Sequence, residues 1–167
     1  IAYNQISPNL KKALITSEDA KFLDHEGFDW EGIQTAWEKN LKKGKIVAGG
    51  STISQQLAKN LFLSGKKTPW RKLEEAAITI MMEKMMSKRR IFEIYLNVIE
   101  WGNGVFGAEA AARHYYRKSA RNLSVGESAK LAAMVPNPRY FDKHRSDRRL
   151  LRKARIIQRR MYYADYP

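Results

Sequence analysis

The sequence predicts an all-α fold in a single domain, and three observations support this. Apolar residues recur three and four positions apart along most of the chain, which is the period of an amphipathic helix. Ser, Thr and Asp stand before several of these segments, where their side chains can cap a helix. No stretch alternates convincingly between apolar and polar residues, as a half-buried strand would. The length of 167 residues suits one domain with a sizeable core.

Composition narrows the classes of function. The chain has 31 Lys and Arg against 17 Asp and Glu, a net charge of +14 with His neutral. This excess favours an anionic partner: nucleic acid, an acidic membrane surface or a phosphorylated substrate. The absence of cysteine excludes disulfide bonds and thiolate metal sites. No uninterrupted apolar run approaches the ~20 residues of a membrane-spanning helix.

The first predicted helix begins near Pro8 and ends at Gly27. Leu14, Glu18 and Phe22 are spaced four apart on it, so a carboxylate lies between two apolar side chains. Carboxylates in apolar surroundings are often functional. The helix pattern alone nevertheless favours Glu18 at the edge of the buried face, with its carboxylate in water.

Two further polar residues belong to this first segment. Asp19 is interpreted as a solvated residue or as the partner of a nearby cation, and His25 follows on the side of Glu18. A second helix starts after Asp29, and its apolar face is formed by Trp30, Ile33, Trp37 and Leu41. Tryptophans at this spacing are more often core residues, but with the lysines that follow they also fit a lipid headgroup layer.

A third helix is predicted over residues 51–63, where Thr52 and Gln55 fit a capping box. Its expected buried stripe consists of Ile53, Leu57 and Leu61. Its polar faces hold a donor-rich set suited to hydroxyl and phosphate oxygens, namely Gln55, Gln56, Lys59 and Asn60. The glycines at 49–50, before Ser51, form a plausible anion cradle at the helix start.

Two motif matches in this region are better explained by chance. Residues 44–51 approach a P-loop, but Gly50 stands where the phosphate-binding lysine belongs, and no strand precedes the segment. Residues 64–67 match the Ser-x-x-Lys of penicillin-binding transpeptidases without the accompanying Ser-Asp-Asn and Lys-Thr-Gly motifs.

A fourth helix starts at Thr68 and Pro69 and places Arg71 and Lys72 within reach of Glu75. This is either a surface ion pair that contributes a few tenths of a kcal/mol, roughly, or a phosphate site in which Glu75 holds the cations or a metal ion. The four methionines that follow are most simply packing residues: Met81, Met82, Met85 and Met86.

The rest of the chain continues the helical pattern. A break at 87–90 precedes a helix with Ile91 and Tyr95 on one face, and residues 97–107 read as a loop with tight turns. A helix of small residues over 108–116 and a capping box at Ser124 follow. The final amphipathic helix, 143–160, presents a basic face that is solvated or lies against anionic lipid.

Five ordered blocks resemble the glycosyltransferase domain that polymerises lipid II, which occurs alone or in class A penicillin-binding proteins. They span most of the chain: Glu18-Asp19-x-x-Phe22-x-x-His25-x-Gly27, Gly50-Ser51-Thr52-Ile53-x-Gln55-Gln56-x-x-Lys59-Asn60, Arg71-Lys72-x-x-Glu75, Lys88-Arg89-Arg90-Ile91-x-Glu93-x-Tyr95-Leu96-Asn97 and Gly104-x-x-Gly107-x-x-x-Ala111-Ala112-x-x-Tyr115-Tyr116. With no transpeptidase module in this sequence, the resemblance is strongest to the monofunctional biosynthetic transglycosylases of glycosyltransferase family 51.

The resemblance implies a lysozyme-like globular lobe and a small, mobile, membrane-facing lobe at roughly 30–67. It implies an enzyme at the outer, periplasmic face of the bacterial inner membrane, held by an N-terminal anchor that this sequence does not contain. Lipid II, the growing glycan strand, anionic lipid and other cell-wall synthesis proteins are the implied partners, and nucleic acid is not. Two positions depart from the family pattern. Lys67 stands where many relatives have arginine, which puts bidentate phosphate contact in doubt, and Phe92 replaces a leucine.

The resemblance also assigns roles to residues. Glu18 becomes the catalytic base, and Glu75 orients charged groups or binds a divalent ion, Mg²⁺ or Mn²⁺, although no cofactor is required. The diphosphate is assigned to Lys59, Lys72, Arg71 and Lys67. The remaining residues expected to bind diphosphate or sugar are Gln55, Gln56, Ser51, Thr52, Asn60, Asp19 and His25.

Two other functions fit parts of the sequence. A lysozyme-like muramidase or lytic transglycosylase also pairs such a fold with a critical glutamate. A basic helical nucleic-acid-binding module is suggested only by the charge of +14. That second alternative lacks a recognisable helix-turn-helix or aromatic stacking motif.

Overall fold

The computed structural model describes residues 1–43, 51–62 and 68–167. The anion cradle at 49–50, both chance motif matches and Lys67 lie wholly or largely outside these residues. The chain is mostly helical, which confirms the predicted all-α class. The helices are α1 (Pro8–Glu18), α2 (Trp30–Lys43), α3 (Ile53–Phe62), α4 (Pro69–Met85), α5 (Lys88–Val98), α6 (Ala108–Tyr116), α7 (Val125–Met134), α8 (Pro138–Lys143) and α9 (Arg148–Arg160).

Three short 3₁₀ turns and one small hairpin complete the described elements. The turns are Tyr3–Gln5, Ala120–Asn122 and Met161–Tyr163. The hairpin pairs β1 (Glu100–Gly102) with β2 (Val105–Phe106) in antiparallel register. It occupies the segment that the sequence predicted as a loop. Its strands are too short to show an alternating pattern.

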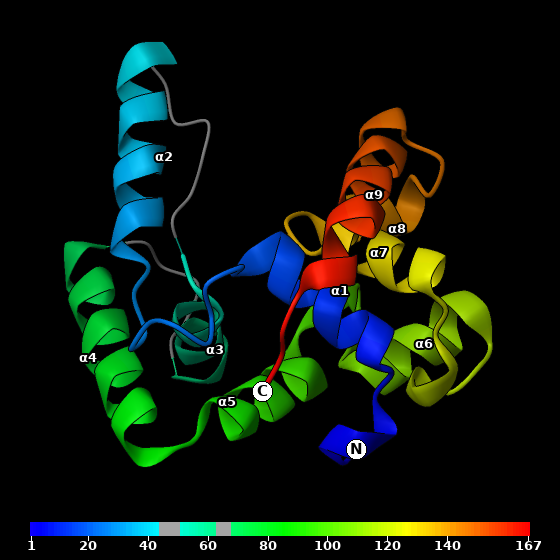
Figure 1. Ribbon diagram of the computed structural model, residues 1–167, viewed down its shortest axis with the longest axis horizontal. Helices are drawn as coiled ribbons and strands as arrows, with labels where there is room; N and C mark the ends of the chain where they lie inside the picture. Colours follow the sequence, from blue (N-terminus) through cyan, green and yellow to red (C-terminus); the bar gives the residue numbers. More distant parts are fainter. Residues whose placement is uncertain (44–50, 63–67) are drawn as a thin grey trace.

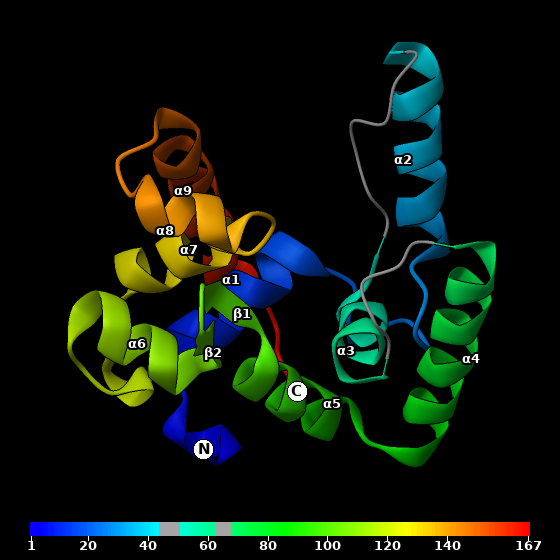
Figure 2. The same ribbon diagram turned by 180° about the vertical axis from the view of Figure 1, so that it is seen from behind.

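The core lies where α7 packs against α1 and α9, with α5, α6 and the hairpin around them. Trp101 of β1 is fully buried there, and its indole nitrogen donates a hydrogen bond of 2.8 Å to the Leu131 carbonyl of α7. Figures 1 and 2 show α2 and α4 on one side of the molecule, and α6 to α9 on the other. Because α3 contacts both α4 and α5, it connects the two sides.

Local capping signals explain where most helices begin. Each predicted cap accepts a backbone hydrogen bond from the first turn of its helix, at Ser7, Asp29, Thr52 and Ser124. Thr68 and Ser87 cap α4 and α5 in the same way. The capping boxes of Thr52 with Gln55 and of Ser124 with Glu127 are both complete. The last helix begins later than predicted, because Asp147 caps it at Arg148 and α8 forms a separate turn before it.

The first helix is shorter than predicted. α1 ends at Glu18, and residues 19–26 form turns before Gly27. The prediction that Gly27 stops this helix was therefore wrong. Gly27 has φ +108°, and a Cβ there would lie 2.8 Å from Cγ2 of Thr79 in α4. Glycine is needed because the turn passes so close to α4.

Several apolar side chains predicted to be buried lie at the surface. Trp30 is 71% exposed and Trp37 is 64% exposed, so the core interpretation of these tryptophans was wrong. Met82 is buried and Met86 packs against the core, as predicted, while the other two methionines and Leu61 are exposed. Periodicity identifies an apolar face but not what covers it. Among the described residues, none of the helices is long and apolar enough to cross a membrane.

Candidate active site

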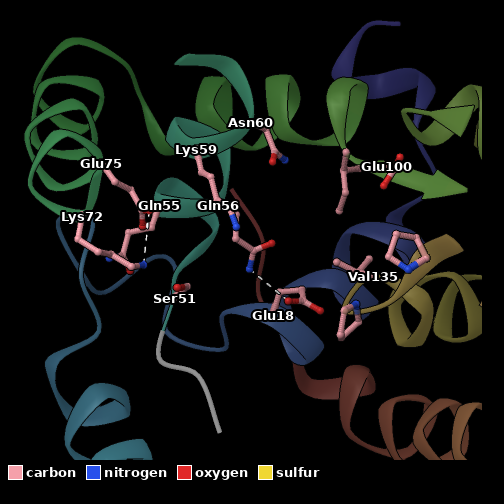
Figure 3. A pocket seen from close by; sticks show the side chains of 13 residues that line it. Glu18, Ser51, Gln55, Gln56, Lys59, Asn60, Lys72, Glu75, Glu100 and Val135 are labelled. Atoms are coloured by element: carbon pink, nitrogen blue, oxygen red, sulfur yellow. Dashed lines mark hydrogen bonds and ion pairs between the residues drawn. The ribbon is translucent and has the colours of Figure 1, made fainter. Parts of the chain in front are cut away.

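A cavity of about 390 Å³ opens between the end of α1, the polar face of α3, the start of α4 and the segment after α7 (Figure 3). Its polar lining residues are Glu18, Ser51, Gln55, Gln56, Lys59, Asn60, Lys72, Glu75 and Glu100. Ile99, Val135, Pro136 and Pro138 supply its apolar wall. The cavity therefore collects chain segments that are far apart in the sequence.

Glu18 lies at the C-terminal end of α1, half-buried, with its carboxylate at the cavity. One carboxylate oxygen accepts a hydrogen bond from the Gln56 amide at 3.2 Å, and the other accepts one from the Ser17 hydroxyl at 3.3 Å. Burial raises the pKa of Glu18 above its ordinary value. The positive charge of Lys153 in α9 and the two hydrogen bonds oppose that rise, while the neighbouring Asp19 adds to it.

Tyr95 of α5 supports this arrangement from behind. Its side chain is fully buried, and its hydroxyl donates a hydrogen bond of 3.0 Å to the Gln56 side-chain oxygen. This contact assigns the Gln56 amide group, which then donates to Glu18. Burial and the Glu18 charge raise the pKa of Tyr95, so its hydroxyl stays a donor. Sequence reasoning had treated Tyr95 as a core residue only.

Cations and a buried carboxylate form the opposite wall. Glu75 of α4 is only 5% exposed, and one of its carboxylate oxygens lies 3.5 Å from the Lys72 ammonium. The surface ion-pair alternative therefore does not describe Glu75, whereas Lys72 is exposed. Lys59 lies in the last turn of α3 and is also exposed to the cavity. Figure 3 shows Lys72 and Glu75 on one side of the cavity and Glu18 on the other, with Lys59 between them.

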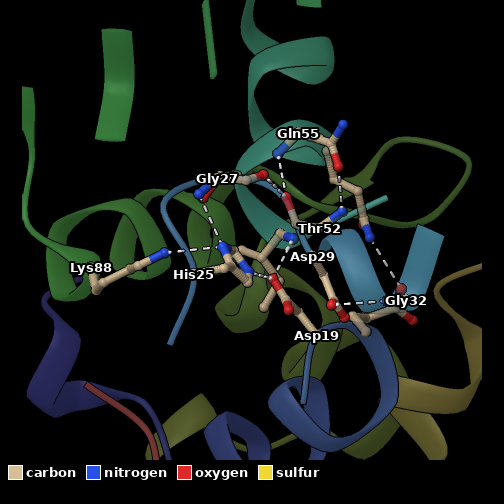
Figure 4. A network of polar contacts seen from close by, with 12 residues as sticks. Asp19, His25, Gly27, Asp29, Gly32, Thr52, Gln55 and Lys88 are labelled. Carbon is tan, nitrogen blue, oxygen red and sulfur yellow. Dashed lines mark hydrogen bonds and ion pairs between the residues drawn. The ribbon is translucent and has the colours of Figure 1, made fainter. Parts of the chain in front are cut away.

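Asp19 and His25 lie outside the residues that line this cavity and form a buried pair (Figure 4). One oxygen of Asp19 lies 2.6 Å from Nε2 of His25 and accepts from the backbone N–H of Ile53 at 3.1 Å. Nδ1 of His25 accepts from the backbone N–H of Gly27, so Nε2 carries the proton. Asp19 is buried, and the interpretation of it as a solvated residue was wrong.

Three other predicted residues lie elsewhere. Thr52 is buried, and its hydroxyl donates to the Gly27 carbonyl at 2.6 Å, which joins the start of α3 to the turn. Arg71 is partly buried in the first turn of α4 and is absent from the cavity lining. Lys67 is outside the described residues. Glu100 and Lys153 were missed. The sequence could have indicated Lys153, because this residue lies beside the buried apolar stripe of α9.

A metal site built by the protein alone finds no support. Within residues 1–43, 51–62 and 68–167, no group of three His, Asp or Glu side chains could hold a metal ion. Glu75 offers one carboxylate at the cation-lined wall. A Mg²⁺ ion is commonly held by one or two carboxylates together with substrate phosphates, so Glu75 would fit such an ion only when a diphosphate is bound.

The chemistry available in this cavity is proton acceptance on one side and neutralisation of an anion on the other. A carboxylate with a raised pKa can take a proton from a hydroxyl. Lysines beside a departing phosphate group stabilise the charge that develops on it. A carboxylate base together with such cations suits transfer of a glycosyl group from a phosphorylated donor to an alcohol.

Comparison with known proteins agrees with this chemistry. The transglycosylase family profile matches residues 1–162. Biosynthetic peptidoglycan transglycosylases from Laribacter hongkongensis and Methylobacillus flagellatus are each 75% identical to this chain over all 167 residues, which cover 73% of each relative. The enzyme of the same name from Chromobacterium violaceum is 73% identical over the same span.

The fold and these similar proteins identify a glycosyltransferase of the all-α type. Because the family profile spans nearly the whole chain, the protein belongs to the transglycosylase family. Its activity is peptidoglycan glycosyl transfer, and it works in the cell envelope.

Proposed function

We propose that the chain polymerises lipid II into β-1,4-linked glycan strands. Glu18 takes the proton from the GlcNAc 4-hydroxyl of the acceptor, and the freed oxygen bonds to C1 of the donor MurNAc. The bond from C1 to the diphosphate breaks, and undecaprenyl diphosphate leaves with the electron pair. Attack opposite the leaving group inverts the configuration at C1. The observation that carries this proposal is that one cavity is lined by Glu18 on one side and by Lys72 on the other, with Lys59 between them (Figure 3).

The charges of the site match this assignment. Lys59 and Lys72 are exposed to the cavity, where they can contact the diphosphate of the donor. Glu75, buried beside Lys72, orients that ammonium and offers a carboxylate to a divalent ion that the diphosphate would share. Arg71, in the first turn of α4, is proposed to add positive charge near the diphosphate. The same role stays a proposal for Lys67, which is outside the described residues.

The side of the molecule that holds α2 and α4 is proposed to face the membrane, as a small lobe at roughly 30–67 extended by α4. Its large exposed apolar side chains are Trp30, Trp37, Leu41, Leu61, Phe62, Trp70, Leu73, Ile80, Met81 and Met85. An exposed apolar surface of this extent is typical of a contact with lipid or protein. A lipid-linked substrate would then reach the cavity from the outer face of the inner membrane, where other cell-wall synthesis proteins work.

Replacing Glu18 with glutamine tests the base. The Glu18→Gln variant keeps the oxygen that accepts from Gln56, so it is expected to fold normally. It should make no glycan strands from lipid II, because an amide cannot take the proton. Polymerisation by this variant would refute the assignment. Release of soluble fragments from cell-wall sacculi by the wild-type chain would favour a lytic enzyme.

A further inference from the structure

A second hollow, of about 490 Å³, lies beside the cavity and shares two lining residues with it, Asn60 and Glu100. We call it the distal basin, and Asn97, Val98, Phe106 and Arg139 complete its lining. Its size falls in the range of about 300–1,000 Å³ that is usual for ligand sites. Because the two hollows share a border, an elongated ligand can occupy both.

We propose that the distal basin binds a sugar of the growing glycan strand that is remote from the reacting C1 carbon. This assignment rests on the proposed function and extends it along the groove. Three features of the basin carry it: its charge balance, its exposed aromatic ring and its position relative to the cationic wall.

The basin presents little net charge. Two nitrogens of the Arg139 guanidinium lie 2.9 and 3.0 Å from the same oxygen of Glu100. The charges of the two side chains therefore compensate each other. A phosphate would gain little here, whereas a neutral sugar would not be repelled. The second carboxylate oxygen of Glu100 has no partner within the described part of the chain, so it can accept from a hydroxyl.

An aromatic ring and an amide complete a surface suited to sugars. Phe106, in β2, is 54% exposed at the basin although it is a large apolar residue. The face of its ring carries partial negative charge, which attracts the partly positive C–H groups of a pyranose. Asn60 is exposed at the border of the two hollows and can both donate to and accept from hydroxyl or acetamido groups.

The position and the charge of the basin together identify the donor strand as its ligand. Figure 3 shows Lys72 and Glu75 at one end of the cavity, with Asn60 and Glu100 toward the other. If the diphosphate lies at the lysines, the sugars of the donor beyond C1 can extend toward Asn60 and into the basin. The acceptor attacks from the side opposite the leaving group, so the charge of the basin decides between the two. The acceptor carries a diphosphate of its own, but Arg139, the one basic residue among the described residues that line the basin, is paired with Glu100.

Phe106→Ala tests the assignment, with Phe106→Tyr as the variant that keeps the ring and Tyr163→Ala as a control. Tyr163 is exposed and does not line either hollow. The first measurement is kcat/KM with a lipid-diphosphate tetrasaccharide donor relative to a disaccharide donor. We expect Phe106→Ala to lower this ratio about fivefold to tenfold, roughly the loss of one stacked ring. Phe106→Tyr and Tyr163→Ala should leave it within about twofold.

The second measurement is the affinity of a soluble N-acetylated tetrasaccharide that carries neither lipid nor phosphate, by calorimetry. Weaker binding to Phe106→Ala alone supports the basin. An unchanged donor ratio in that variant, or an equal loss with both donors, overturns it. A wild-type chain that binds the tetrasaccharide through Phe106 but makes no strands would refute the proposed function and leave the basin standing.

Discussion

At the scale of single residues, the unusual feature is a carboxylate held between opposing influences. Burial raises the pKa of Glu18, and the Lys153 charge opposes that rise from α9, which packs on α1. Gln56 and Ser17 also favour the ionised form, while Asp19 disfavours it. A base needs a pKa high enough to accept a proton and low enough to be ionised at working pH. Lys153 shifts this balance toward the ionised form.

Removal of that charge should change the pH dependence of the reaction. Lys153→Met takes away a charge that lowers the pKa of Glu18, so the pKa rises further. Because Glu18 is proposed to act in its ionised form, the acidic limb of the plot of rate against pH should move to higher pH. The measurement is lipid II turnover across pH. Arg155→Met, exposed on the same helix, is the matched control and should shift the limb less. Coincident profiles for Lys153→Met and wild type would contradict the role of Lys153.

The same pKa shift predicts an effect on stability. A folded-state pKa above the unfolded value means that the native chain binds the Glu18 proton more tightly. The free energy of unfolding therefore falls as pH rises through the window between those two values, and it stays lower above it. Glu18→Gln should have a higher melting temperature than wild type at neutral pH, with the difference shrinking as pH falls. Thermal unfolding at several pH values measures this. A difference in melting temperature that does not depend on pH would contradict the raised pKa of Glu18.

At the scale of elements, the start of α3 is held by the turn that follows α1. The Asp19 carboxylate accepts from the first backbone N–H of α3, where a negative charge also favours the helix dipole. Thr52 adds a bond to Gly27. α3 carries Gln56 and Lys59, so these contacts fix parts of both walls of the cavity. Asp19 and His25 are therefore better placed to position this helix than to touch substrate.

Asp19→Asn should weaken the contact between the turn after α1 and the start of α3. The change removes a charge that two buried donors contact, which should lower the free energy of unfolding by about 1–3 kcal/mol. Denaturant titration measures the change. Asp24→Asn, on the exposed part of the same turn, is the control and should stay within about 0.5 kcal/mol. Equal stabilities for the two variants would show that the Asp19 contacts do not secure α3.

The sequence predicted these elements well where local signals decide them, and poorly where packing does. Capping residues such as Ser7 and Ser124 identified helix starts, and the motif blocks named residues that the cavity brings together. The end of α1 depends on the hydrogen bond between Asp19 and the start of α3. No local sequence pattern encodes this contact. Glu100 joins the site only because the hairpin folds beside α8. Whether each predicted site residue acts on substrate stays a prediction.

At the scale of the whole molecule, charge and apolar surface are distributed differently. The basic residues of α9 lie on the side of the molecule that holds α6 to α9. The exposed tryptophans of α2 and α4 lie on the opposite side (Figure 1). A net charge of +14 attracts any anionic surface, including nucleic acid, without specifying it. Apolar side chains select a lipid bilayer more strongly, because they gain by leaving water.

The proposed membrane face can be tested with vesicles of anionic lipid. The double variant Trp37→Ala and Trp70→Ala removes two side chains that are 64% and 73% exposed. Its affinity in a sedimentation assay should fall at least about tenfold, given what burial of large apolar side chains contributes. Tyr163→Ala is the control on the other side of the molecule. Equal vesicle binding by both variants would place the membrane contact elsewhere.

The single helix α3 contributes Gln56, which contacts the proposed base Glu18, and Lys59, which is proposed to contact the diphosphate. A compound that wedges against its polar face would therefore obstruct proton acceptance and diphosphate departure together. Substitutions in α3 that exclude such a compound would also disturb one of these two steps. Escape from inhibition at this helix should consequently carry a cost in turnover.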